Sequence, residues 1–167
     1  MDKKAAIESI EGAMASLEAQ MKYMAYLIAG VDLKQEVLST YVTECGFDSW
    51  LESNREWILK LFGKTTLEEL VRLHAVRLDE NGRICDIVRL NGERKGVFGR
   101  LFGRKKVAQE DLDRAKAYYD DLKKTNDKLI RKMQILLIRA KSRPAEDYTG
   151  ISVLKKEEKW QKSIASI

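Results

Sequence analysis

The chain has 167 residues, which predicts a single domain. Hydrophobic residues make up 44% of it and no apolar run approaches the roughly 20 residues that span a membrane, so a buried core is expected and a membrane-spanning helix is not. The net charge of +5 is too small to indicate nucleic-acid binding by itself, and two cysteines without a signal peptide predict a reducing, cytoplasmic setting.

The first third of the chain predicts three helices. Apolar residues recur at three- and four-residue spacing over residues 3–29, which is typical of one face of a long helix. A short helix is predicted for residues 33–43. The segment Cys45-Gly-Phe-Asp-Ser-Trp-Leu51 leads into an aromatic-rich helix that includes Trp50 and Leu51 and ends near Gly63.

The next segment, residues 67–90, has two interpretations. Its apolar residues can share one face of a continuous helix, which would place Gly82 inside that helix at a cost of about 1 kcal/mol relative to alanine. Asn81-Gly82 between apolar runs is also a strong hairpin signal, so a small hairpin over residues 73–90 is the alternative. We favour the helix.

A basic connection follows over residues 91–106. Its apolar side chains include Phe98 and Phe102, and its hydrophobic tip could touch an anionic membrane surface or nucleic acid. We favour the other interpretation, a solvated loop whose phenylalanines close the end of a bundle. The basic residues that would make the contact are Arg94, Lys95, Arg100, Arg104, Lys105 and Lys106.

The last long helix is predicted from about Ala108 to Ser142 by four unbroken heptads. Asn126 falls on the apolar seam, where a polar residue commonly determines register and oligomeric state. The seam therefore predicts a coiled-coil dimer or a protein partner, and the alternative is packing against the other helices of the same chain. The residues proposed for the interface are Leu112, Tyr119, Asn126, Leu129 and Met133.

These elements together predict an all-α fold. We expect an antiparallel, four-helix-bundle-like domain over residues 1–142 with a long C-terminal heptad helix. Residues 143–167 are expected to form a linker followed by a short helix or a disordered tail.

Cys45 and the sole histidine, His74, are the candidate metal or redox residues. Thiolate and imidazole are strong zinc ligands, but a four-ligand site needs two more donors, and Glu18 is a tentative third. Cys85 is eleven residues after His74, about 16 Å along a continuous helix, which is too far to share one ion. The alternative is a free buried cysteine and a histidine in the core. With one histidine and no evident nucleophile–base pair, we expect neither an enzyme nor a small-molecule substrate.

The segment around Cys45 resembles the Cys-x-Phe-Gly-x-Trp motif of the chemoreceptor zinc-binding (CZB) family. Cys45, Phe47 and Trp50 match that motif, whereas Asp48 replaces its glycine. Residues 67–90 resemble the family's His-x-x-x-His helix, with His74 at the first histidine and Leu78 at the second. The histidine of the family's first helix would fall at Leu17 or Glu18.

The resemblance, to small stand-alone members of the family, covers about residues 3–140. It implies an antiparallel helical bundle with a cytoplasmic role in bacterial signalling. Because two of the family's ligands are replaced, the site is expected to have lost its zinc or to hold it differently. We therefore expect a non-catalytic signalling or interaction module with no cofactor or with zinc. The alternative is a metal or redox sensor that uses Cys45 and His74.

Overall fold

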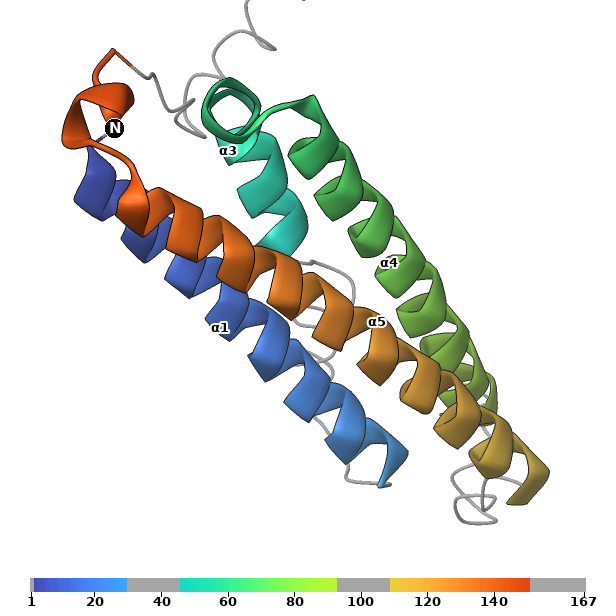
Figure 1. Cartoon of the computed structure of the whole chain (residues 1–167). Helices are drawn as coiled ribbons and strands as arrows, with labels where there is room; N and C mark the ends of the chain where they lie inside the picture. The colour runs from blue at the N-terminus through green and yellow to red at the C-terminus, as the bar shows by residue number, and fades with distance from the viewer. Residues whose placement is uncertain (1, 30–45, 93–108, 151–167) are drawn as a thin grey trace, which may run out of the picture.

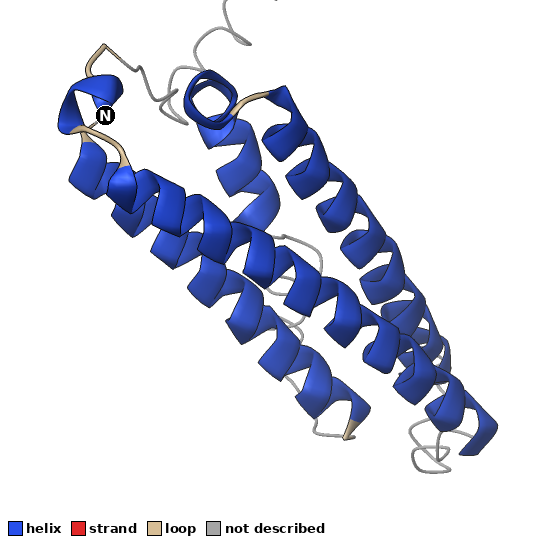
Figure 2. Ribbon diagram, viewed as in Figure 1, coloured by secondary structure: helices blue, strands red, loops and turns tan. Residues whose placement is uncertain are grey.

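The computed structural model describes residues 2–29, 46–92 and 109–150, with side chains in the last turn of the middle segment, 88–92, left out. These residues form an all-helical bundle without strands, as the periodicity predicts (Figures 1 and 2). The long helices are α1 (Lys3–Ile28), α3 (Gly46–Phe62), α4 (Lys64–Gly92) and α5 (Gln109–Ser142), and a short 3₁₀ helix, η2 (Ala145–Tyr148), follows them. Within the described part, no helix is long and apolar enough to cross a bilayer.

The helices alternate in direction along the chain. Figure 1 shows α5 running beside both α1 and α4, whereas α3 covers one end of the bundle. This difference follows from length, because α3 has 17 residues and the other three have 26 to 34. The end of the bundle that contains α3 therefore holds the larger apolar core, and the candidate site lies there.

The boundary between α3 and α4 is a single residue, Gly63. Its φ of +87° is left-handed, a conformation that glycine adopts without the steric cost of a Cβ atom, and its N–H closes α3 on the carbonyl of Leu59 at 3.1 Å. The chain can therefore turn sharply, and α4 begins at once.

The α4 helix is continuous through Asn81-Gly82, so the hairpin alternative for residues 73–90 is wrong. Asn81 and Ile84 are buried on the same side of α4 as Leu73, at helical spacing, and this burial outweighs the local turn preference. Leu78 does not share that side as expected and is 37% exposed. Cys85 is buried in a second apolar cluster with Met24, three helical turns from His74.

The continuity of α4 makes Gly82→Ala a stabilising change. A Cβ atom built at Gly82 meets nothing within 4 Å, and the residue has no positive φ. We expect the free energy of unfolding to rise by about 0.5–1 kcal/mol, measured by urea unfolding. Gly63→Ala is the matched control and should destabilise, because its φ is positive. A destabilising Gly82→Ala would contradict a continuous helix.

The heptad seam of α5 faces inward, toward α1 and α4. Leu129 and Met133 are fully buried and Asn126 is 5% exposed, whereas Leu112 and Tyr119 are half-buried nearer the start of the helix. These side chains therefore pack within the chain, which was the alternative to a dimer. A dimer built on the same side chains stays a prediction, and it would require the bundle to open.

Contacts with the bundle continue beyond residue 142, in the segment that was expected to be a linker. Tyr148 is fully buried and its hydroxyl donates to the carbonyl of Ala140 at 3.0 Å. The guanidinium of Arg143 donates to the carbonyl of Leu61 and pairs with Asp147 at 2.8 Å. Tyr148 therefore packs in the core, and Arg143 ties this segment to the end of α3, whereas residues 144–146 are exposed.

Several sequence predictions lie outside the described residues. They are the short helix at 33–43, the cysteine at position 45, the tail from residue 151, and the basic loop with Arg94, Lys95, Arg100, Arg104, Lys105 and Lys106.

Candidate functional site

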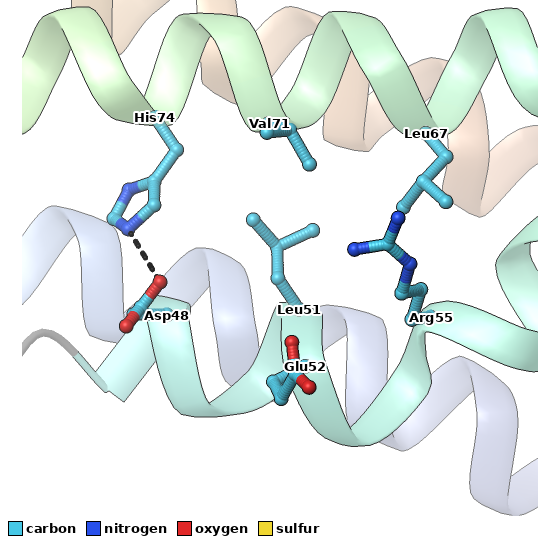
Figure 3. Close-up of a pocket in the computed structure, with 7 residues that line it drawn as sticks. All are labelled: Asp48, Leu51, Glu52, Arg55, Leu67, Val71 and His74. Atoms are coloured by element: carbon cyan, nitrogen blue, oxygen red, sulfur yellow. Dashed lines mark ion pairs between the residues drawn. The ribbon is translucent and has the colours of Figure 1, made fainter.

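The candidate site is centred on His74, in the half of α4 that packs against α3. The imidazole is 4% exposed and meets the ring of Phe47 edge-on, with 5.1 Å between ring centroids. Neither ring nitrogen has a hydrogen-bond partner, although both are buried. Oδ1 of Asp48 lies 3.5 Å from Nε2 (Figure 3). A buried donor or acceptor without a partner costs about 1–3 kcal/mol, so this arrangement calls for a ligand or for a compensating gain in packing.

Phe47 and Asp48 are held in place because the start of α3 is pinned to α1. A Cβ atom on Gly46 would come within 3.0 Å of Oγ of Ser16, so only glycine allows this approach without a shift. Trp50 stacks on Phe47 and donates its indole N–H to Oγ of Ser9 at 2.8 Å. These contacts explain why glycine and two aromatic residues stand together after Cys45.

The electrostatics of the site keep His74 neutral. Burial lowers the pKa of the imidazole, and the positive charge of Arg77 lowers it further. The carboxylate of Asp48 acts in the opposite direction but is 73% exposed, so water screens it. A neutral imidazole is the form that binds a metal ion.

A pocket of about 140 Å³ opens beside this pair. Figure 3 shows His74 and Asp48 at one end of it and Arg55 and Leu67 at the other, with Leu51 and Val71 between them. Glu52 also lines it. Ligand pockets for drug-sized molecules measure about 300–1,000 Å³, so this one is suited to an ion or a few waters.

The burial of His74 predicts a pH-dependent stability. Because the folded pKa lies below the usual value near 6.5, the unfolded chain binds the proton more readily, and stability should be complete above that value and fall as pH decreases through it. Urea unfolding between pH 7.5 and 5.5, with a chelator present, measures this slope. His74→Phe should flatten it, since the chain has no other histidine. An equal slope in the variant would contradict the shift.

His74 and Asp48 fit part of a metal site. Their separation of 3.5 Å exceeds the 2.7–3.2 Å of a good hydrogen bond and is close to the separation of about 3.4 Å between two donors on a tetrahedral zinc ion. The described residues contain no group of three or more potential ligands. Cys45, the donor that the sequence analysis pairs with His74, immediately precedes α3 in the sequence and lies outside the described part.

The other predicted ligands are not brought to this pair. Glu18 is exposed on α1. Leu17 beside it is fully buried in the core, so one of the two positions at which the CZB resemblance would place a histidine holds an apolar core residue. Leu78 likewise supplies no donor. Cys85 lies too far along α4, as the continuous helix requires.

Arg77, which was not expected in the core, is 1% exposed in the centre of the bundle. Its Nε donates to Oδ1 of Asn126 at 2.9 Å and its Nη1 donates to Oε1 of Gln20 at 2.6 Å, which links α4 to α5 and to α1. The polar residue on the α5 seam therefore has its partner within the chain. The sequence did contain an indication that Arg77 is buried, because this residue lies on the apolar side of α4, three residues after His74.

No protein-family model matches this chain, and comparisons with curated proteins and with solved structures give no match either. The resemblance to the CZB family therefore depends on the residues quoted above and stays a prediction.

Proposed function

We propose that this chain is a non-catalytic signalling or interaction module that binds a divalent transition metal, with zinc the first candidate, where α3 meets α4. The observation that carries the proposal is His74, a neutral and buried imidazole whose two nitrogens have no hydrogen-bond partner. Asp48 lies beside Nε2 at a separation that suits two ligands of one ion.

The donor set favours zinc or a similar ion over magnesium or calcium. Imidazole suits zinc, copper, iron and nickel, whereas magnesium and calcium prefer sites made of oxygen ligands. Nε2 of His74 and Oδ1 of Asp48 would hold the ion, and Cys45 would add a thiolate. Bound there, the ion would supply a positive charge that holds the start of α3 to the middle of α4.

Two observations support a binding role over an enzymatic one. The sole histidine forms no hydrogen bond with any nucleophile in the described residues, so it activates none there. The pocket beside it has room for an ion rather than for an organic substrate. A module of this kind would pass the state of its site to a protein partner or to a second copy of itself in the cytoplasm.

Two alternatives stay as predictions. Redox sensing by Cys45 would need a thiolate that is accessible to oxidants. Binding of an anionic surface would use the basic loop, Arg94 to Lys106. Both depend on residues outside the described part.

The test is the zinc content and zinc affinity of protein purified without chelator or a metal-affinity tag. We expect one zinc ion per chain, lost in His74→Gln and Cys45→Ala and bound at least about tenfold more weakly in Asp48→Asn. Glu52→Gln is the matched control, because it removes the same charge from the same pocket and should leave the affinity unchanged.

Two results would reject the proposal. One is no zinc, copper, nickel or iron bound by the wild-type chain at micromolar concentration. The other is an affinity that is the same in His74→Gln and in the wild type. In either case the buried histidine would be a packing residue, and its cost would be offset by its contact with Phe47.

A further inference from the structure

A second periodic stripe runs along the outer side of α5. Lys128, Arg131, Ile135, Ile138 and Ser142 follow one another at spacings of three, four, three and four residues, and all five are exposed. We call these residues the outer stripe. Ile135 and Ile138 are 52% and 67% exposed, the two highest values among the large hydrophobic side chains described as exposed. Spacing of this kind is how one helix presents side chains to another.

The second half of α5, which carries the outer stripe, is strongly basic. Between residues 128 and 143, α5 and the residue after it carry six basic residues and no acidic one. Three of the six form ion pairs within the chain: Lys132 with Glu69, Lys141 with Glu11, and Arg143 with Asp147.

The other three positive charges have no carboxylate partner. Arg139 donates to the hydroxyl of Thr66 and to the carbonyl of Phe62, both of which are neutral. Lys128 and Arg131 form no ion pair with the residues that the structure describes. The two exposed isoleucines are therefore flanked by cationic side chains that form no ion pair with a described carboxylate, and the nearest acidic residue along α5 is Asp127, one turn before Arg131.

From this combination we infer that the outer stripe docks an acidic amphipathic helix of another protein. Its aliphatic residues would pack on Ile135 and Ile138, and its carboxylates would face Lys128 and Arg131. Charge complementarity selects this partner, because a second copy would bring one basic stripe against another. The inference uses no residue of the metal site and does not depend on the proposed function.

The test uses two displayed libraries of helical peptides about three heptads long, with aliphatic residues at a and d. One library carries glutamate at the flanking positions and the other carries lysine. We expect the wild-type chain to enrich peptides from the acidic library only. A selected peptide should bind with micromolar affinity that weakens as salt rises.

Two variants change the outer stripe in different ways. Both the pair Ile135→Ser with Ile138→Ser and the pair Lys128→Glu with Arg131→Glu should weaken the selected peptide at least tenfold. The matched control is Lys116→Glu with Lys123→Glu, which makes the same charge change at exposed positions elsewhere on α5 and should leave affinity unchanged. Circular dichroism confirms that each variant folds.

Three outcomes would overturn the inference. Enrichment from neither library, or equally from both, would mean that the stripe does not select an acidic helix. Self-association that the isoleucine variants abolish would assign the stripe to a second copy. Binding to phosphatidylserine vesicles, with no acidic peptide enriched, would assign it to a lipid surface.

Discussion

Replacing Arg77 by methionine is expected to lower the free energy of unfolding by about 3–5 kcal/mol. The guanidinium is 1% exposed and donates to amide oxygens of Gln20 and Asn126. Methionine fills much of the same volume but removes the guanidinium hydrogen bond from both of these oxygens. Each such loss costs about 1–3 kcal/mol.

Chemical unfolding of Arg77→Met measures the total, and a double-mutant cycle with Asn126→Ala isolates the contact between the two side chains. We expect a coupling of about 0.5–3 kcal/mol in that cycle. Arg72→Met, an exposed arginine on the same helix, is the control and should change stability by less than about 0.5 kcal/mol. Additive effects of the two core changes would show that the hydrogen bonds contribute little.

The second large effect is expected for Leu129→Ala, at about 2–5 kcal/mol. Leu129 is fully buried on α5 in the same cluster as Met133 and Leu136, so the change removes apolar contacts and leaves a cavity in a packed core. Urea unfolding measures the loss.

Ile138→Ala provides the comparison, because it shortens an aliphatic side chain on the same helix at a position that is 67% exposed. It should change stability by less than about 0.5 kcal/mol in the isolated protein. Similar losses at both positions would contradict the inward orientation of the heptad seam.

The helices of this protein could be predicted because the apolar face of a helix is set by residues that are close together in the sequence. Apolar residues three and four apart must lie on one face, and on α5 this placed Leu129 and Met133 on one apolar seam, which the structure buries within the chain. The same logic favoured a continuous α4 over a hairpin at Gly82, and the burial of Ile84 confirms it. The all-α class followed from these periods, and Gly63 marked the end of α3 by its freedom to adopt a positive φ.

What only the tertiary structure decided is which polar side chains meet. Asp48 and His74 lie on different helices, and Arg77 reaches Gln20 and Asn126 across 57 and 49 residues of sequence. Periodicity places Asn126 on an inner face but cannot tell whether its partner lies in another chain or in this one. Tyr148 was assigned to a linker for the same reason, since its burial depends on contacts with α5 that a local pattern does not record. The faces of a helix are determined by the spacing of residues along the chain. A site is formed by residues on different helices, so it is determined by how those helices pack.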